Sequence, residues 1–342
     1  AGIAELESAS PGLHLLSIAR IARSEPEALA MIQEGRARDL SDLPTGPTLG
    51  GLLEFLEKHG DRAVREAELM TPRWSEDHGT LFDMLRATLR GPDLDPQAAP
   101  ARARARADRE MARLESVLTA VELALVRALV SLDQSYTRLR ERMRAWVTRT
   151  LSAIRRVGLD IARRMLRLDC ELEEGAAFCG SYEELIKALR SGSGDIARLT
   201  RLRRAEYQRD CARPEPPATF VGRPPAVSLP PSSTPRLFGL AASPGVVEGR
   251  ARVVNQGGKA ASALQPGEIL VARTTDIGAS PLFLVAVGVV TELGGPLSHA
   301  AIVAREYNVP AVVNVEGATL SIHTGDRLRV DGDRGVVERL DG

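Results

Sequence analysis

The stretch Thr291-Glu-Leu-Gly-Gly-Pro-Leu-Ser-His-Ala-Ala-Ile-Val-Ala-Arg-Glu306 places one histidine, His299, where a glycine-rich turn becomes a helix. The apolar residues 287–290 predict a short buried strand before the turn, and residues 300–306 predict the start of a helix after it. The first N–H groups of such a helix have no partners within the helix, and its dipole is positive at that end. An anion is therefore favoured next to His299.

The residues between strand and helix fit this arrangement. Gly294 and Gly295 permit a tight turn with close backbone approach, and Pro296 is expected in the first helical turn, where its missing N–H costs little. An imidazole has an ordinary pKa of about 6.5 and is a competent nucleophile at pH 7 when neutral. The geometry suits a histidine that carries a phosphoryl group. The alternative is that His299 only packs or caps at a helix start.

The segment resembles the phosphohistidine domain, also called the mobile or swivelling domain, of enzymes that use phosphoenolpyruvate or ATP. Examples are phosphoenolpyruvate synthase, pyruvate phosphate dikinase and rifampin phosphotransferase. The residues that carry the resemblance are Thr291, Gly294, Gly295, Ser298, His299, Arg305, Glu306 and 310–313. It extends to residues 243–245 and 249–253 upstream and to residues 331–333 and 335–337 downstream. The resemblance implies a swivelling β/β/α fold and identifies His299 as the phosphoryl carrier.

Five further residues are candidate phosphoryl-binding residues. Thr291 is expected to orient the His299 ring or to bond the phosphoryl group, and backbone N–H groups around Gly294, Gly295 and Ser298 are expected to cradle its oxygens. Arg305 follows His299 by six residues, about 600° of helical turn, which places it off the face of the histidine. It is expected either to meet a partner domain or to form a structural salt bridge.

The fold class predicted for the whole chain is multidomain: a mostly α-helical domain over residues 1–212, then a Pro-rich linker, then the phosphohistidine domain. Between residues 113 and 167 apolar residues keep a 3–4 spacing, and two long antiparallel helices are expected there. Gly158 or residues 131–134 are the expected break. A coiled-coil dimer is the alternative, disfavoured because the apolar stripe is not a sustained heptad with charged flanks.

A linker is predicted at residues 213–235, because eight prolines fall within residues 214–235. Proline-rich chain is extended, with a rise of about 3.1 Å per residue, and the segment either moves a domain or lies along the surface. Residues 236–342 change to short strands separated by Gly, Pro and Asp. The expected strands are 237–241, 250–254, 268–272, 287–291, 311–313, 327–330 and 335–338, and the expected helices are 280–285 and 299–307.

A weaker resemblance lies upstream. Residues 55–69 and 72–74 are similar to the helical acceptor-binding region of rifampin phosphotransferase and related synthase-like proteins. Arg65, Glu66 and Glu68 are the candidate acceptor-binding residues there, although such charged residues also occur on a solvated helix face. Many of these relatives carry a histidine where this chain has Asp61. That difference leaves the acceptor chemistry open.

The sequence shows no nucleotide-binding domain. It has no GxxxxGK[ST] motif, and residues 1–90 lack alternating strands with glycine loops. In the relatives an ATP-grasp domain passes the β-phosphate of ATP to the histidine. We therefore expect this chain to bind no cofactor, ATP and Mg²⁺ to belong to an ATP-grasp domain or subunit, and a small-molecule acceptor to bind the helical domain. Two alternatives stay open: the carrier part of an ATP-dependent ligase, and a binding or regulatory protein with a vestigial or regulatory histidine domain.

Composition limits the other functional classes. The chain has 45 basic and 45 acidic residues, so bulk charge does not predict nucleic-acid binding. The arginine run at residues 101–106 is followed at once by acidic residues and has no aromatic residues between its arginines. The three cysteines lack CxxC spacing and the histidines are scattered, so no metal site is expected. No membrane span or signal peptide is visible, and a cytoplasmic location is expected. The absence of an initial methionine suggests a fragment or a processed product.

Overall fold

The computed structural model describes residues 7, 9–91, 93, 95–167, 175–191, 195–211, 213, 221–222, 235–254 and 264–340. Most of the predicted linker, residues 213–235, lies outside these residues. The packing divides the chain into two units. Unit 1 comprises residues 1–66, 73–147 and 231–342, and unit 2 comprises residues 67–72 and 148–230. These units follow packing and do not test the predicted domain boundaries, which stay predictions.

The N-terminal part of unit 1 is helical, as predicted. Its helices are α1 (Ser10–Arg23), α2 (Pro26–Gln33), α3 (Pro47–His59) and α4 (His78–Arg90), with a short 3₁₀ turn η1 (Leu40–Asp42). A proline lies in the first turn of α1, α2 and α3, where it has no N–H to leave unpaired. Trp74, Phe55 and Phe82 are almost fully buried at the centre of the core that joins these helices.

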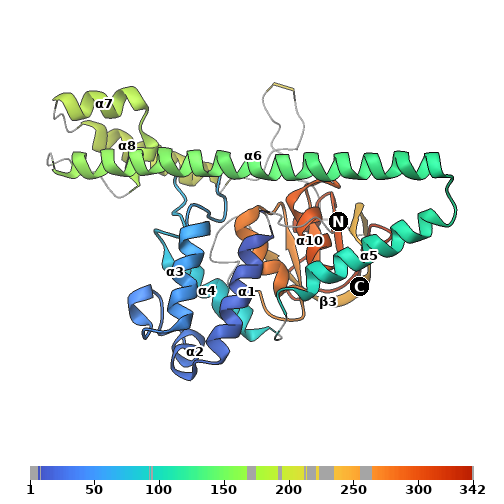
Figure 1. The fold of residues 1–342 in the computed structure, drawn as a ribbon. Helices are drawn as coiled ribbons and strands as arrows, with labels where there is room; N and C mark the ends of the chain where they lie inside the picture. The colour runs from blue at the N-terminus through green and yellow to red at the C-terminus, as the bar shows by residue number, and fades with distance from the viewer. Residues whose placement is uncertain are drawn as a thin grey trace. The chain divides into compact units, whose positions relative to one another are not determined.

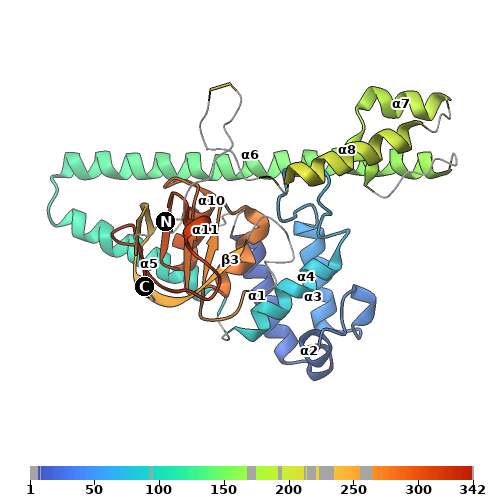
Figure 2. The same cartoon turned by 180° about the vertical axis from the view of Figure 1, so that it is seen from behind.

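The C-terminal part of unit 1 is a mixed sheet with helices against it (Figures 1 and 2). The strands are β1 (Arg236–Phe238), β2 (Leu240–Ser243), β3 (Val246–Val254), β4 (Glu268–Ala272), β5 (Gly288–Thr291), β6 (Ala311–Val313), β7 (Arg327–Asp331) and β8 (Val336–Arg339). Their order is β1-β8-β7-β3-β4-β5-β6-β2. Strands β3, β4, β5 and β6 are neighbours in the sheet and run parallel to one another. The loops that follow β4 and β5 therefore emerge at the same edge of the sheet.

Three helical elements connect these strands: the 3₁₀ segment η3 (Ile277–Leu284), α10 (His299–Tyr307) and α11 (Ala318–Ser321). Residues of η3 and α10 share one apolar core with Ala9 and with Ala87 of α4. Helix α1 lies beside η3 (Figure 1). The helical part and the sheet part of unit 1 are therefore packed on each other through a continuous apolar core.

Most of the predicted strands and helices of this part are confirmed. The bounds of β4, β6 and α10 are those predicted. The predicted strand 237–241 is two strands, because the chain turns at Gly239, where a Cβ would lie 2.5 Å from the Val313 carbonyl oxygen. The predicted helix 280–285 belongs to the 3₁₀ segment η3, which contains Pro281. A proline inside a helix removes one N–H donor and disfavours regular α-helix.

The prediction of two antiparallel helices between residues 113 and 167 is wrong. Helix α5 (Ala98–Glu115) ends at the beginning of this region, and α6 (Ala120–Arg167) is a single helix of 48 residues (Figure 1). Neither residues 131–134 nor Gly158 interrupts it. The break lies at residues 116–119, where Thr119 and Glu122 form a capping box: the Thr119 N–H donates to Oε2 of Glu122, 2.9 Å, and the Glu122 N–H donates to Oγ1 of Thr119, 3.4 Å.

Gly158 is explained by packing in unit 2. A Cβ at this position would lie 2.7 Å from Cε1 of Phe178, so the glycine lets the aromatic ring approach the helix backbone. Besides the end of α6, unit 2 contains the 3₁₀ turn η2 (Ala176–Cys179), α7 (Tyr182–Ser191) and α8 (Asp195–Cys211). Met165, Ala177 and Leu185 belong to its core.

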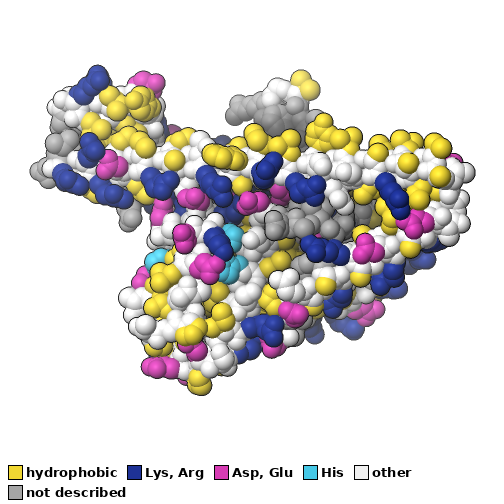
Figure 3. Space-filling view, in the orientation of Figure 1, with side chains coloured by type: hydrophobic (Ala, Val, Ile, Leu, Met, Phe, Trp, Pro, Cys, Tyr) yellow, Lys and Arg dark blue, Asp and Glu magenta, His cyan; other side chains and the backbone are white. Residues whose placement is uncertain are grey.

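Helix α6 has its apolar residues on the outside over much of its length. Figure 3 shows hydrophobic side chains along this helix. Leu125, Leu129 and Leu132 are each more than half exposed, whereas Thr137 and Glu141 are buried. No helix in the described part of the chain is both long enough and apolar enough to span a bilayer.

Candidate functional site

His299 is the first residue of α10, at the sheet edge where β4 and β5 end. Ser298 caps the helix: its Oγ accepts the N–H of Ala301 at 3.4 Å. The predicted position of the histidine at a helix start is thus confirmed. Pro296, however, precedes the cap and lies in the turn rather than in the first helical turn, because the serine side chain is the cap.

The predicted phosphoryl-binding residues of the turn are gathered in front of the helix. Gly294 has φ of 149°, a conformation that favours glycine, and a Cβ there would lie 2.9 Å from Oγ of Ser298 and 3.5 Å from Oγ1 of Thr291. The Thr291 side chain is fully buried, and its Oγ1 has no hydrogen-bond partner among the described residues. Gly295 has open space where a Cβ would be. The turn therefore brings the hydroxyl groups of Ser298 and Thr291 close to the backbone of Gly294, which has no side chain.

Arg305 does not point to the histidine. Its Nη1 donates to the Ala242 carbonyl at 3.2 Å and its Nη2 to the Pro296 carbonyl at 2.6 Å. Burial lowers the pKa of this guanidinium. Arg305 therefore holds the glycine-rich turn against β2, which is a positioning role that the helical spacing alone did not predict.

The side chain of His299 is buried, with only 6% of its surface exposed. A phosphoryl carrier has to be accessible to its donor, and in this position the imidazole is not. Nε2 lies 3.4 Å from Oγ of Ser280, and the ring of Phe283 stands edge-on with its centroid 6.0 Å away. Burial lowers the pKa of His299 to about 3, and the positive charges of Arg144 and Arg62 add to the effect. The ring is neutral at pH 7.

The two arginines come from the helical part of unit 1 and are bound to a candidate acceptor residue. Glu66 is buried; its Oε2 lies 3.2 Å from Nη1 of Arg62 and its Oε1 lies 3.6 Å from Nε of Arg144. Arg62 also lies 3.6 Å from Oε2 of Glu7. Glu66 is thus a buried carboxylate, paired with the buried Arg62 and the partly exposed Arg144, whose charges act on His299; it does not lie on a solvated helix face.

Arg65 takes part through its backbone. Its φ is 61°, an uncommon value for a residue with a Cβ, and its N–H donates to Oδ2 of Asp276. Gly278 follows Asp276 by two residues. A Cβ at Gly278 would lie 2.2 Å from the Ala63 carbonyl oxygen and 2.6 Å from the Val64 nitrogen. The loop after β4 is therefore seated on the backbone of residues 63–65.

Asp276 has unusual protonation chemistry. Burial of the carboxyl, together with the negative charge of Glu66, raises its pKa to about 6 against the opposing effect of the Arg65 N–H bond. Its Oδ1 is buried and has no hydrogen-bond partner among the described residues. This is the pKa range in which a carboxylate can take and return a proton near neutral pH.

The third candidate acceptor residue, Glu68, belongs to unit 2, where its Oε1 accepts the N–H of Met70 at 3.0 Å. The structure thus brings Arg65 and Glu66 together with the His299 region. No sequence motif pointed to four other residues near the histidine: Arg62, Arg144, Asp276 and Ser280. A signal was available for Asp276: it follows a predicted strand that is parallel to the strand before His299, and the carboxyl ends of such strands share one edge.

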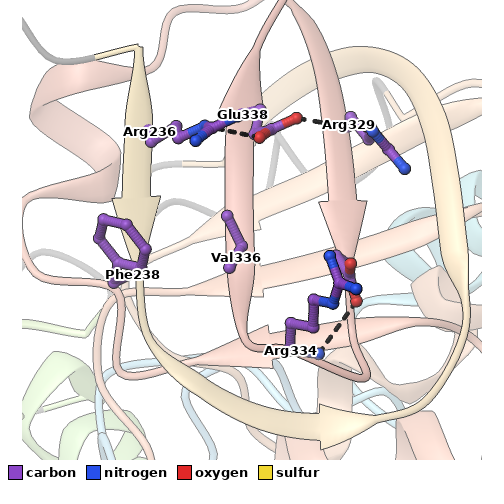
Figure 4. Close-up of a pocket in the computed structure, with 7 residues that line it drawn as sticks. Arg236, Phe238, Arg329, Arg334, Val336 and Glu338 are labelled. Atoms are coloured by element: carbon purple, nitrogen blue, oxygen red, sulfur yellow. Dashed lines mark hydrogen bonds and ion pairs between the residues drawn. The ribbon is translucent and has the colours of Figure 1, made fainter.

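A separate hollow lies on the outer strands of the sheet, lined by residues of β1, β7 and β8 (Figure 4). Two of its arginines are paired with Glu338: Nε of Arg236 at 2.7 Å and Nη1 of Arg329 at 3.8 Å. It contains neither the histidine nor the residues around it. Among the described residues no group of three or more His, Cys, Asp or Glu side chains could hold a metal ion.

Comparisons with known proteins match two parts of the chain to families. Residues 1–141 match the fourth domain of rifampicin phosphotransferase, and residues 264–335 match the mobile domain of PEP-utilising enzymes. Both segments bear on the site, because Arg62 and Glu66 lie in the first and His299 in the second.

Similarity to individual proteins extends over nearly the whole chain. It is 34% identical to the prodigiosin synthesizing transferase PigC of Serratia marcescens and 32% identical to the rifampicin phosphotransferase of Streptomyces sviceus. The rifampicin phosphotransferase of Bacillus cereus is 28% identical. Each match covers 96% of this chain and 39% of the relative. The chain therefore spans about two fifths of the length of these curated relatives.

Proposed function

We propose that the chain, whose residues 264–335 match the mobile domain of PEP-utilising enzymes and whose residues 1–141 match the fourth domain of rifampicin phosphotransferase, is the carrier and acceptor part of a phosphotransferase. His299 holds the phosphoryl group, and the helical part of unit 1 binds the acceptor. The phosphoryl group derives from ATP bound by an ATP-grasp domain or subunit, as the resemblance implies.

One observation carries this proposal: the positive charges of the buried Arg62 and of Arg144, whose side chain is 41% exposed, act on a buried, neutral histidine. Arg62 and Arg144 disfavour a proton on His299, and by the same electrostatics they favour an anion there. A phosphoryl group on the ring is such an anion, and guanidinium groups suit its oxygens. Glu66 holds both arginines in place when no phosphoryl group is present.

The transfer step needs a proton acceptor as well as charge. When the oxygen of an acceptor hydroxyl attacks phosphorus, the phosphorus–nitrogen bond breaks, its electron pair returns to the imidazole, and the hydroxyl proton must leave. Asp276 is suited to accept this proton, because its Oδ1 is buried without a described partner and its pKa is raised to about 6. Catalysis then rests on positioning and charge neutralisation.

The experiment is labelling of the 342-residue chain in an extract of the source cells, with ATP labelled at the β- or the γ-phosphate. We expect acid-labile, base-stable label from the β-phosphate on the wild type and none on His299→Ala. His323→Ala is the matched control, because this histidine lies in the same part of the chain with its side chain 72% exposed. Equal labelling of wild type and His299→Ala would exclude His299 as the carrier.

A second candidate function is the carrier part of an ATP-dependent ligase, in which the phosphoryl group activates one substrate and then leaves as phosphate. The 34% identity to PigC favours it, because that relative is named as a transferase that synthesizes prodigiosin. The two candidates differ in their products. A phosphorylated end-product supports the phosphotransferase, and release of all transferred label as inorganic phosphate together with a condensed product supports the ligase.

The third alternative, a binding or regulatory protein, predicts a different result of the same labelling. It requires that no label reach His299 from ATP or phosphoenolpyruvate, or that label on His299 never pass to a small molecule. Chase of labelled wild-type chain with unlabelled extract metabolites distinguishes these cases.

A further inference from the structure

Over residues 125–146 the apolar outer face of α6 has a regular heptad spacing, contrary to the expectation that its apolar stripe is not a sustained heptad. In a heptad written abcdefg, Leu129, Tyr136 and Met143 occupy a positions. The d positions are Leu125, Leu132, Leu139 and Trp146. This 3–4 alternation over residues 125–146 is the pattern by which one helix packs along another.

All seven of these side chains are exposed. Their exposed fractions run from 45% for Leu139 to 64% for Tyr136. The opposite face of the same helix is the buried one, although it carries Thr137, Glu141 and Ala145. An amphipathic helix ordinarily buries its apolar face. The inverted arrangement leaves a straight apolar seam, about 33 Å long at 1.5 Å per residue, on the outside of unit 1.

We propose that this seam, residues 125–146, pairs with the same seam of a second copy of the chain as an antiparallel two-helix coiled coil. In the register that sets Tyr136 opposite Leu139 of the second copy, Leu132 faces Met143 and Leu129 faces Trp146. Each a position then meets a d position, which is how apolar layers form in an antiparallel pair.

Charge complementarity selects this orientation. Asp133 and Arg140 are both exposed e positions, and in the antiparallel register they face each other across the two copies, twice by symmetry. A parallel pair sets g positions against e positions and would instead bring Ser135 to Arg140, with no opposite charges. Pairing also costs little ordering, because α6 is already helical within unit 1.

The oligomeric state of the full 342-residue chain tests the proposal. Sedimentation equilibrium is expected to show a dimer, and Leu132→Glu is expected to raise its dissociation constant about 100-fold, since two symmetry-related layers each lose about tenfold. Leu53→Glu on α3 is the matched control, because Leu53 and Leu132 are both 53% exposed. A wild type that stays monomeric at tens of micromolar, or a dimer that Leu132→Glu leaves unchanged, would overturn the proposal.

Disulfide cross-linking tests the register, in a background with serine at the three native cysteines. A mixture of Leu132→Cys and Met143→Cys chains is expected to give the mixed disulfide. In the antiparallel register the two copies of residue 132 are about 16 Å apart along the axis, beyond the reach of a disulfide. Predominant 132–132 cross-links would overturn the antiparallel register and indicate a parallel pair.

Charge exchange tests the ion pairs. Asp133→Arg alone is expected to weaken the dimer about tenfold because it sets like charges opposite each other, and the double variant Asp133→Arg, Arg140→Asp is expected to restore it. Failure of the double variant to recover affinity while both variants keep wild-type helicity by circular dichroism would remove the charge pairing from the proposal.

Discussion

At His299 the protein favours the uncharged imidazole, and this has a consequence for stability. The pKa of the ring is about 3 in the folded chain and about 6.5 when unfolded. Between these values the unfolded chain binds more protons, so the free energy of unfolding falls as pH is lowered from about 6.5 toward 3. His299 alone should contribute a slope of about 1 kcal/mol per pH unit inside that window.

The comparison variant is His299→Gln, which stays neutral at every pH. Asp276 acts in the opposite direction: its pKa is raised to about 6, so its contribution to stability falls as pH rises from about 4 through 6. Denaturant unfolding at pH 7, 5.5 and 4.5 is therefore best done in an Asp276→Asn background, with and without His299→Gln. Equal pH slopes for the two chains would contradict the burial of a neutral His299.

The variant Gly278→Ala tests the close packing of the loop after β4 against the backbone of residues 63–65. Its φ is not positive, so alanine is allowed by the backbone, and the cost of Gly278→Ala is the collision with the Ala63 carbonyl. We expect the free energy of unfolding to fall by about 1–3 kcal/mol. Gly50→Ala in α3 meets no atom within 4 Å and should stabilise the chain by up to about 1 kcal/mol.

At the scale of elements, the break between α5 and α6 depends on a local signal. Thr119→Ala removes the hydroxyl that caps α6 and should cost about 1 kcal/mol, seen as faster hydrogen exchange in residues 120–124. Ser116→Ala is the control, because that hydroxyl donates to the Arg113 carbonyl at the end of α5 and caps no N–H group. Equal exchange in both variants would mean that tertiary packing alone sets the start of α6.

The elements that the sequence predicted well carry strong local signals. Strand β4 and helix α10 are bounded by turn residues and by a serine cap, and their predicted bounds agree with the structure. Helix α6 was predicted wrongly because Gly158 was interpreted as a helix break. Glycine is needed at position 158 because the ring of Phe178 packs against the helix backbone there, and this contact joins residues far apart in the sequence. Local patterns cannot distinguish a glycine that ends a helix from one that admits a neighbour.

In the candidate site, too, residues within one local motif could be predicted from the sequence, whereas residues brought together only by packing could not. His299, Thr291 and the glycine turn form one continuous motif, so the sequence identified them together. Arg62 lies in the loop after α3 and Arg144 lies on α6, so the two charges that act on His299 come from separate parts of the chain. No local pattern links either of them to the histidine, because only the packing of α10 and η3 on the helices brings them close.

At the scale of the whole molecule, the proposed transfer from a separate donor would require His299 to leave its buried position. Tyr307 opposes that movement: its hydroxyl donates to the Ala9 carbonyl at 2.6 Å within a buried contact. Tyr307→Phe removes this hydrogen bond and leaves the Ala9 carbonyl only the N–H of Leu13, 3.3 Å away. At a cost of about 1–2 kcal/mol, the state in which α10 has moved away from Ala9 should be populated about 5- to 30-fold more.

The readout is modification of His299 by diethyl pyrocarbonate, which reacts with accessible neutral imidazole, followed by mass spectrometry of the peptide. We expect the rate to rise by the same factor of about 5 to 30 in Tyr307→Phe. Tyr182→Phe is the control, because Tyr182 is 69% exposed and lies in unit 2. An unchanged rate in Tyr307→Phe would show that this bond does not hold the histidine in place.

The contact between Gly278 and residues 63–64 is made by main-chain atoms on both sides. Such a contact depends on the course of the backbone and not on which side chains residues 63 and 64 carry. The fit between the loop after β4 and residues 63–64 therefore does not depend on the neighbouring side chain of Asp61. Position 61 can change during evolution while the two parts of unit 1 keep the same packing.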